Sequence, residues 1–583
     1  MNKIKMNQVV KDLDFLSLRR NLKKDFSGFK SLNIAILGDS STQLLNQALK
    51  GFGYEKQINF QIHEADYSQI EQEIFNSSSQ LYNTNPDFII IFHSVQKLQS
   101  KFYESVASDK INFALNYIEY LNGLFNKIKE SSEAKILYFN FVEINDFIFG
   151  NYGNKVESSF IFQLRKLNYE LMRLSINQTN VFINDISSLN NQEGLRYSFD
   201  AKLFVNNDLV FSLDFLVKVA KNTTNIILSQ LGIFKKCLIL DLDNTIWGGI
   251  IGDDGLDKIQ IGDLGIGKAF TGLQIWAKQL KQRGIILAVC SKNTEHIAKE
   301  PFEKHPDMIL KLEDISVFVA NWDSKVGNIK YIQSVLNIGF DSMVFLDDNP
   351  YERGIVKNGI PDILVPELPK DPSKYLGFLN NLNLFETSTF SEEDIERTKQ
   401  YQEEAKRVVL KNTHNSEAEY LSSLEMISEM KDFDKYSIPR VAQLTQRSNQ
   451  FNLRTIRYLE NEIMNISTSD EYFTLSFDLN DKFGKYGLIS AVILKKDKEH
   501  LFIDTWIMSC RVLKRGMEEF VLNKIVDVVR KNGFTKIVGE YIPTPKNGVV
   551  KDHFKNLGFV TEGKNWVLDV NNFKPLKTHV NGK

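Results

Sequence analysis

The sequence predicts an α/β protein of three domains. Over roughly the first 390 residues, short apolar runs alternate with segments of helical periodicity, which is typical of doubly wound parallel sheets. After about residue 430 the pattern changes to three extended segments in succession, which indicates an α+β domain. A chain of 583 residues is long enough for about three separate cores. We expect domains at 1–232, 233–386 and 431–583, with a charged helical connector at 387–430 that begins with a capping box from Ser391 to Asp394.

In the first domain, strands are expected at 33–37, 58–62, 87–92, 135–140 and 181–183. The segment G-D-S-S-T follows the first of them, and Gly38-Asp39-Ser40 resembles the nucleophile block of SGNH hydrolases. A serine esterase also needs a base beside its nucleophile, and that family supplies it from a late D-x-x-H. Here no D-x-x-H begins at Asp185 or Asp200, and His63 and His93 are the only histidines before residue 230. We therefore expect an SGNH-like fold that is not catalytic and that has a docking or lid role.

The second domain opens with K-C-L-I-L-D-L-D-N-T at 236–245, an apolar strand at 237–240 followed by two aspartates. Ligands of open α/β sheets bind beyond the carboxyl ends of the strands, so Asp241 and Asp243 are placed for chemistry. Two carboxylates at this spacing can share a metal ion and divide the roles of nucleophile and general acid–base.

Three further groups follow in order. A strand at 284–290 delivers Ser291, a helical pattern begins at Lys325, and a strand at 341–346 delivers Asp347 and Asp348. A capping serine, a surface lysine and an acidic turn are each common, but their ordered coincidence with the first motif is not. Together they resemble motifs I to IV of the haloacid dehalogenase (HAD) phosphotransferase superfamily.

The resemblance implies Mg²⁺-dependent phosphoryl transfer. Asp241 would attack phosphorus, and Asp243 would protonate the leaving group and then activate water. Ser291 and Lys325 would hold the phosphoryl oxygens. Mg²⁺ would be held by Asp241, the main-chain carbonyl of Asp243, and Asp347, with Asp348 as a supporting acid. Thr245 and Asn293 are further candidates for substrate or phosphate contacts.

The loops of this domain leave no room for a separate cap. Between Asp243 and Ser291 there is space for a flap at 247–255 and one helix around 273–280. Between Ser291 and Lys325 there is space for only a helix and a strand. Capless members of the superfamily leave the site open to large substrates, or close it with a neighbouring domain.

The last domain is expected to have a helix at 439–447 and extended segments at 471–478, 487–495 and 501–510. The segment R-V-L-K-R-G-M at 511–517 then leads into a helix, and this resembles the GNAT acetyltransferase fold. Its glycine-containing loop would meet a helix N-terminus, which suits an anion such as a pyrophosphate, but the usual Q/R-x-x-G-x-G/A is not intact. Candidate contacts for an acyl thioester or a pantetheine chain are Asn449, Gln450, Asn452, Asp481, Arg511, Arg515, Gly516 and His553.

An SGNH-like, a capless HAD and a GNAT-like domain in this order resemble the FkbH-like family, HAD subfamily IIIC. The segments N-T-I-W-G-G, V-C-S-K-N, F-L-D-D-N-P-Y-E-R, L-T-Q-R-S-N-Q-F-N-L, D-K-F-G-K-Y-G-L and S-C-R-V-L-K-R-G all look like that family's motifs. The family implies removal of phosphate from 1,3-bisphosphoglycerate, a small three-carbon substrate. It also implies transfer of the glyceryl unit to the phosphopantetheine thiol of an acyl carrier protein, which supplies polyketide pathways.

Such a transfer needs a thiolate. Cys290 lies beside Ser291, although strand alternation points it to the other face, and Cys510 ends a strand of the last domain. These two cysteines are ranked equally, whereas Cys237 is expected to be a small buried hydrophobe. Three cysteines in all suit a reducing cytoplasm rather than a disulfide framework.

Composition excludes some partners and leaves two rival functions. A net charge of −2 gives no support for nucleic-acid binding, and no apolar run approaches the length of a membrane span. We also find no signal-peptide pattern at the N-terminus. The rivals are a simple HAD phosphatase with flanking assembly domains, and an acyltransferase that uses CoA in the GNAT-like domain.

Overall fold

The computed structural model describes residues 13–390, 397–411, 413–414, 416–498 and 500–583. They form two compact units, one ending at Leu228 and the other running from Ser229 to Lys583. The predicted domain limits at 232, 386 and 430 stay a prediction. Within the described ranges, no helix has both the length and the apolar character that crossing a bilayer requires.

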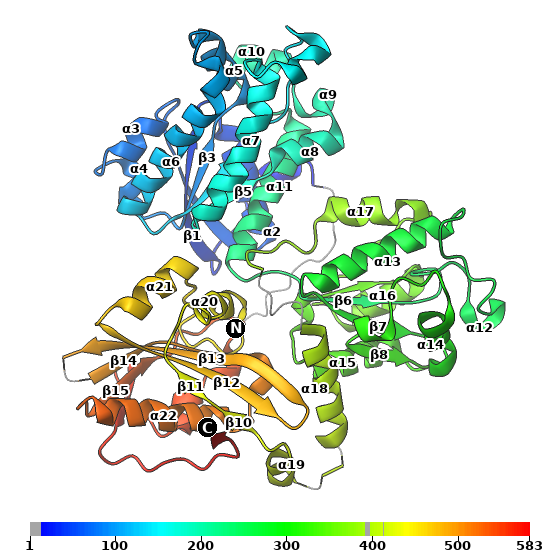
Figure 1. The fold of residues 1–583 in the computed structure, drawn as a ribbon, viewed down its shortest axis with the longest axis vertical. Helices are drawn as coiled ribbons and strands as arrows, with labels where there is room; N and C mark the ends of the chain where they lie inside the picture. Colours follow the sequence, from blue (N-terminus) through cyan, green and yellow to red (C-terminus); the bar gives the residue numbers. More distant parts are fainter. Residues whose placement is uncertain (1–12, 391–396, 412, 415, 499) are drawn as a thin grey trace. The chain divides into compact units, whose positions relative to one another are not determined.

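The first unit is the predicted doubly wound sheet. Its strands are β1 (Lys30–Gly38), β2 (Ile58–Glu64), β3 (Phe88–Phe92), β4 (Lys135–Phe139) and β5 (Val181–Asn184). They lie in the order β2-β1-β3-β4-β5, and every pair is parallel. Figure 1 shows α6 (Phe113–Ser131) and α7 (Phe160–Asn177) in front of this sheet. The central strands β3 and β4 consist almost entirely of buried apolar residues, because helices cover both faces of a parallel sheet.

The second unit begins with a smaller parallel sheet in the order β8-β7-β6-β9. Its strands are β6 (Cys237–Leu240), β7 (Ile286–Ser291), β8 (Val317–Ala320) and β9 (Met343–Leu346). Alternate side chains of β6 divide between two cores. Leu238 and Leu240 pack with α13 (Gly267–Gln282) and α14 (Glu295–Lys304), whereas Cys237 and Ile239 pack with α15 (Lys325–Leu336) and α16 (Pro350–Gly359).

The connector contains α18 (Arg397–Lys411) and α19 (Glu417–Ser423). The expected capping box at Ser391 and Asp394 lies outside the described residues. Tyr401 of α18 is buried in the core that Cys237 and Ile239 form with α15, called the α15 core below. Gln402 Nε2 donates to the main-chain oxygen of Ile315 at 2.9 Å. This helix therefore packs directly on the sheet that precedes it.

The rest of the second unit is a mixed sheet. Three long antiparallel strands, β12 (Tyr472–Asp481), β13 (Gly484–Asp497) and β14 (His500–Met508), follow one another. β14 then pairs in parallel with β15 (Lys536–Glu540) after a crossover through α22 (Met517–Lys531), and β15 pairs with β17 (Asn565–Asp569). α22 packs on one face of this sheet, and α20 (Ile438–Arg447) packs on the opposite face. The predicted fold class, with its parallel sheets and final α+β domain, is confirmed.

One arrangement in this sheet was not predicted. β14 and β15 pair only from His500 to Ile503, and beyond that point they part. The chain at 451–453 lies between them, because Met508 N donates to Phe451 O at 3.2 Å and Ile542 N donates to Leu453 O at 2.9 Å. Phe451, Asn452 and Leu453 are all buried. The chain thus fills the opening in its own sheet.

Candidate active site

The predicted motif residues meet at the carboxyl edge of the four-stranded sheet. Asp241 directly follows β6, and Asp347 directly follows β9, the neighbouring strand. Lys325, the first residue of α15, places Nζ 2.9 Å from Asp241 Oδ2 and 2.6 Å from Asp347 Oδ2. Burial by itself lowers the pKa of Lys325, but the two carboxylates outweigh it and raise that pKa. The lysine is therefore a permanent cation between two acids.

The acids at this edge fit a divalent cation. Asp241, Asp347 and Asp348 each offer a carboxylate oxygen, and these atoms lie within 4.8 Å of one another. Asp241 Oδ1 is buried and has no hydrogen-bond partner among the described residues. Burial and the nearby Asp241 raise the pKa of Asp347 to about 6, because two buried carboxylates repel one another. Oxygen ligands of this kind are those that Mg²⁺ prefers.

Asp243 is held by three donors. Its Oδ1 accepts from Trp247 Nε1 at 2.9 Å and from the main-chain N of Ile251 at 3.0 Å, and its Oδ2 accepts from Asn293 Nδ2 at 3.1 Å. Burial nevertheless raises the pKa of Asp243. A carboxyl group that is fixed in orientation and protonates more readily than usual suits proton transfer.

The remaining predicted residues of the motifs lie around these acids. Ser291 is the buried last residue of β7, and Thr245 Oγ1 accepts from the main-chain N of Asp348 at 3.1 Å. Asn293 contacts Asp243 rather than standing free. The structure brings all of these residues to one edge, and their catalytic roles stay predictions.

Two functional contacts were missed. Trp247 and Arg353 both occur in quoted motif segments, but nothing in the sequence tied either to an aspartate. Arg353 Nη1 donates to the main-chain oxygens of Asp347 and Asp348 at 2.8 and 2.7 Å, so it fixes the acidic turn. Only α12 (Ile251–Asp254) and α13 lie between β6 and β7, so the expected capless architecture is confirmed for the described chain.

The three cysteines have different surroundings. Cys237 and Cys290 are buried in the α15 core, and burial raises the pKa of the Cys290 thiol to about 12. Its Sγ donates to the main-chain oxygen of Lys325 at 3.9 Å. Cys510 is half-buried, and its carbonyl accepts from Asn337 Nδ2 at 2.6 Å, at the C-terminal end of α15. The 12-residue α15 is about 18 Å long, so Cys510 and Lys325 lie at opposite ends of it.

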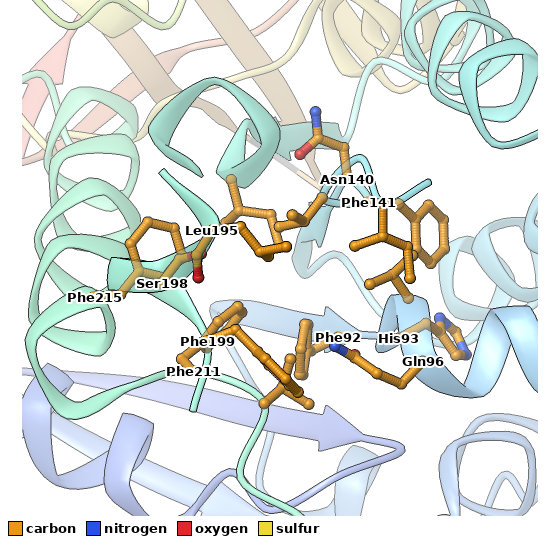
Figure 2. Close-up of a pocket in the computed structure, with 15 residues that line it drawn as sticks. Phe92, His93, Gln96, Asn140, Phe141, Leu195, Ser198, Phe199, Phe211 and Phe215 are labelled. Carbon is orange, nitrogen blue, oxygen red and sulfur yellow. The ribbon is translucent and has the colours of Figure 1, made fainter. Parts of the chain in front are cut away.

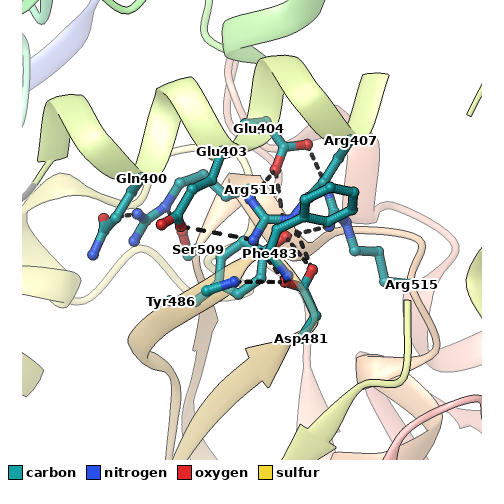
Figure 3. Close-up of polar contacts among 11 residues, drawn as sticks. Gln400, Glu403, Glu404, Arg407, Asp481, Phe483, Tyr486, Ser509, Arg511 and Arg515 are labelled. Carbon is teal, nitrogen blue, oxygen red and sulfur yellow. Dashed lines mark hydrogen bonds and ion pairs between the residues drawn. The ribbon is translucent and has the colours of Figure 1, made fainter. Parts of the chain in front are cut away.

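Both arginines of the predicted acyl site contact α18 (Figure 3). Arg511 Nη1 donates to Gln400 Oε1, and Arg515 Nη2 donates to Glu404 Oε1. On the same helix, Arg407 binds Asp481 with two hydrogen bonds of 2.7 and 2.8 Å. Tyr486 joins the Arg515–Glu404 pair to the Arg407–Asp481 pair, because its hydroxyl accepts from Arg515 and lies 3.3 Å from Asp481 Oδ2 (Figure 3). These predicted residues thus form a buried charge network within the chain.

The predicted anion site at the N-terminus of α22 also meets the chain itself. Gly516 caps this helix with φ +84°, a conformation that favours glycine. A Cβ on Gly516 would lie 2.9 Å from Thr578 Oγ1, and that hydroxyl donates to Gly516 O at 2.6 Å. The segment at 578–579 therefore covers this turn.

Two of the other predicted acyl-site residues, Asn449 and Asn452, bind main-chain groups. Asn449 Nδ2 donates to Gly232 O at 3.0 Å, and Asn452 Oδ1 accepts from Thr455 N at 2.8 Å; Gln450 lies between them. His553 is enclosed by aromatic rings, with ring centroids 4.5 Å from Trp506 and 4.8 Å from Phe451. Burial lowers its pKa to about 3, so the ring is neutral. These residues support the segment that fills the sheet opening.

In the first unit, Asp39 and Ser40 follow β1. Both oxygens of Asp39 accept from Ser94 N at 2.9 Å, and burial raises the pKa of Asp39 to about 6. Ser40 Oγ is buried and has no hydrogen-bond partner among the described residues. His93 is bound through Nδ1 to Tyr138 Oη at 3.0 Å, and burial lowers its pKa to about 3. Neither arrangement is that of a serine activated by a base.

A small hollow opens at the same edge of this sheet. Most of the residues that line it are apolar, and Figure 2 shows Phe92, Phe141, Phe199, Phe211 and Phe215 among them. Asn140, which also lines it, is bonded to Asp185 and Ser187. The lining is therefore apolar and does not contain Ser40.

The family model described as "FkbH, N-terminal domain" matches residues 33–228. Curated proteins gave no match. The N-terminal part of protein BF1531 from Bacteroides fragilis, which contains a phosphatase domain and was crystallised in complex with Mg, is 49% identical. The match covers 65% of this chain and 100% of that chain, with a TM-score of 0.63.

Two acetyltransferase structures are more distant. Spermidine N-acetyltransferase from Vibrio cholerae, in complex with CoA and spermine, is 12% identical over 25% of this chain and 96% of its own, with a TM-score of 0.20. An acetyltransferase of the GNAT family from Desulfovibrio desulfuricans is 10% identical over 25% of this chain and 99% of its own, with a TM-score of 0.21. Likeness at this level identifies no ligand. The Bacteroides fragilis structure, in contrast, is matched over its whole length at 49% identity, and the chain belongs to the FkbH-like family.

Proposed function

We propose that this protein is a Mg²⁺-dependent phosphatase that also transfers the glyceryl group of 1,3-bisphosphoglycerate, or of a similar phosphorylated acyl donor, to the thiol of an acyl carrier protein. The observation that carries the proposal is the convergence of Asp241, Asp243 and Lys325 at one sheet edge without a cap. A nucleophile, a proton donor and a fixed cation are the groups that phosphoryl transfer needs.

Hydrolysis of the phosphoester follows from these positions. Asp241 attacks phosphorus, the P–O bond to the three-carbon unit breaks, and Asp243 gives its proton to the leaving alkoxide. Asp243 then takes a proton from the water that attacks the aspartyl-phosphate, so phosphate leaves and both aspartates are restored. Lys325 lies 2.9 Å from Asp241, so its charge is next to the oxygens that become negative.

Asp241, Asp347 and Asp348 would hold Mg²⁺, as the relative's complex with Mg supports. When bound, the ion supplies positive charge to the phosphoryl oxygens. The chain's own part is to keep the three carboxylates in place, which it does through Lys325 and Arg353.

Acyl transfer uses the other phosphate of the donor. The acceptor sulfur attacks the acyl carbon, the C–O bond to phosphate breaks, and the thiol proton ends on the departing phosphate. The absence of a cap among the described residues favours this reaction, because a carrier's flexible arm could reach the edge from solvent. The family resemblance supports the identity of both donor and acceptor.

The two rivals differ in what they require. A simple phosphatase needs only the edge at Asp241. A CoA-dependent acyltransferase needs Arg515 and the turn at Gly516, but these contact Glu404 and Thr578 of the same chain. The contacts favour the carrier-protein reaction over the CoA reaction.

The test is phosphate release from 1,3-bisphosphoglycerate with Mg²⁺, with and without a holo-acyl carrier protein, together with the intact mass of the carrier. We expect carrier loading that accompanies phosphate release, and a loss of about 10³-fold or more in phosphate release for Asp241→Asn with an unchanged melting temperature. Asp257→Asn, at an exposed aspartate just after the flap, is the matched control. Phosphate release without any loading would leave only the phosphatase, and normal turnover of Asp241→Asn would contradict both.

A further inference from the structure

Two large aromatic side chains stand exposed in segments that follow strands at the carboxyl edge of the four-stranded sheet, the edge that holds the candidate active site. Trp322 is 73% exposed and Tyr351 is 72% exposed. Trp322 lies in the loop that follows β8, and Tyr351 lies just after the acidic turn that follows β9. Since β8 and β9 are the two outer strands of the sheet, the aromatics flank the strands that carry Asp241 and Ser291.

The loop that carries Trp322 is fixed to the catalytic edge. Asn321 N donates to Ser291 O at 3.2 Å. The side-chain amides of Asn321 and Asn328 donate to one another at 3.3 and 2.7 Å, which ties the loop to α15. The indole is thus one residue from a direct contact with Ser291 and three residues from Lys325.

The turn that carries Tyr351 is fixed in the same way. Asn349 N donates to Asp347 Oδ1 at 2.8 Å, and Asn349 Oδ1 accepts from Tyr351 N at 2.9 Å. Asn349 therefore binds both the side chain of Asp347, a candidate metal ligand, and the main chain of Tyr351. Isolated exposed aromatics need no explanation, but these two are held by the hydrogen bonds that also build the site.

The depth of the catalytic groups limits what can reach them. Asp241 is 6% exposed and Lys325 is 3% exposed, whereas Trp322 and Tyr351 are 73% and 72% exposed. A folded carrier protein cannot approach such buried groups, but a narrow chain that ends in a thiol can. Rigid Trp and Tyr side chains are efficient contact surfaces, because little conformational freedom is lost when they are covered, and both are enriched among the residues that dominate binding.

We propose that Trp322 and Tyr351 bind the pantetheine arm of the acyl acceptor and guide its thiol to the donor held at Asp241. This inference rests on the proposed function and adds to it the residues that recognise the acceptor. The arm carries two methyl groups and two amides, so its middle offers the apolar surface that the two rings can cover. The reaction is the one balanced above, in which sulfur replaces phosphate on the acyl carbon and the thiol proton leaves with that phosphate.

The experiment compares three acceptors of increasing length: N-acetylcysteamine, free pantetheine and a holo-acyl carrier protein. We expect Trp322→Ala and Tyr351→Ala each to raise KM for pantetheine and for the carrier by about tenfold. The kcat at saturation should stay within about twofold, and KM for N-acetylcysteamine, which lacks the middle of the arm, should not change. Trp322→Phe should restore most of the affinity. Tyr436→Ala is the matched control, since Tyr436 is 78% exposed and lies at α20, away from this edge.

Each outcome has a definite meaning. If the wild-type enzyme loads the carrier and both alanine variants do so with unchanged KM, this inference is overturned and the proposed function stands. A loss of kcat with all three acceptors alike would mean that the aromatics support the fold of the site, which also overturns it. If the wild-type enzyme loads no acceptor, the proposed function fails and this inference fails with it.

Discussion

The indole Nε1 of Trp247 donates a hydrogen bond of 2.9 Å to Oδ1 of Asp243, and the whole tryptophan side chain is buried. The two residues are four apart on the turn that follows β6, so a residue of the same motif orients the proposed proton donor. The neighbouring Asn293 binds the other oxygen of Asp243. The carboxyl group is therefore held from both sides.

Trp247→Phe should lower kcat for phosphate release by about tenfold, because a hydrogen bond to a charged group is worth about 1.5–3 kcal/mol. KM should change little, since the indole does not face the substrate. Trp276→Phe is the control, because Trp276 packs on Phe385 and not on Asp243. Equal effects of the two substitutions would show that general packing, rather than the bond to Asp243, is responsible.

The stability of the first unit should depend on the ionisation of Asp39. Its pKa is raised to about 6 by burial, against an ordinary value of 3.8, so the folded state disfavours the charged form. The resulting loss of stability is absent below about pH 4 and fully present above pH 6, and it amounts to about 3 kcal/mol. Asp39→Asn should therefore stabilise this unit fully at pH 7.5, but by only about 1 kcal/mol at pH 4.5, where ionisation has just begun.

Calorimetry at both pH values tests this, with tryptophan fluorescence to separate the units. All five tryptophans lie after residue 229, so unfolding of the first unit is seen in the heat signal without a change in tryptophan emission. A stabilisation that is the same at both pH values would contradict the assigned pKa.

Breaking the buried ion pair between Arg407 of α18 and Asp481 of β12 should greatly lower the free energy of unfolding. Arg407 and Asp481 are both almost fully buried, and Asp481→Ala would leave a buried guanidinium without its main partner. We expect a loss of about 3–5 kcal/mol in the free energy of unfolding, measured by urea denaturation with tryptophan fluorescence. Asp497→Ala removes an exposed partner of His500 and should change stability by less than about 1 kcal/mol. A loss as small as that for Asp481→Ala would mean that the network is open to water.

The cysteines should differ in reactivity. Iodoacetamide should modify Cys510 first in the native protein, because Cys237 and Cys290 are buried and burial raises the pKa of both thiols. Peptide mass spectrometry identifies the labelled residue. Because the acceptor thiol attacks the acyl phosphate directly in the proposed reaction, and Cys510 lies at the far end of α15 from Lys325, Cys510→Ala and Cys290→Ala should both load the carrier thiol at the wild-type rate. Early labelling of Cys290 would contradict the buried environment described here.

Ser40→Ala should leave phosphate release and carrier loading within about twofold of wild type, and no esterase activity should be found with short acyl esters. The reason is that Ser40 is buried and that His93 is bound to Tyr138 rather than to a serine. Hydrolysis that depends on Ser40 would show that a base reaches it from elsewhere.

Local patterns predicted most of the fold and the catalytic edge. The apolar run before Asp241 and the helical spacing after Lys325 depend only on nearby residues, and β6 and α15 lie where those patterns placed them. Because parallel strands end at one edge, order along the chain was enough to bring Asp241, Lys325 and Asp347 together. Contacts between distant segments were not predictable in this way.

The arginines of the last domain illustrate the limit. Arg511 and Arg515 follow a strand and precede a helix, which is a reasonable place for an anion site. Their partners Gln400 and Glu404 lie 111 residues earlier, on a helix that the sequence indicated only as a charged connector. A single sequence does not reveal that pairing. The insertion of 451–453 between β14 and β15 was missed for the same reason.

That insertion has a consequence for association between molecules. Two strands that part leave unpaired N–H and C=O groups, and such bare edges recruit strands from other chains. Here the main-chain oxygens of Phe451 and Leu453 accept hydrogen bonds from Met508 N and Ile542 N. The sheet therefore offers no unpaired edge for a strand of another molecule at that point. A shortened loop that pulled 451–453 away would expose both edges, and the first symptom would be aggregation at high protein concentration rather than a loss of catalysis.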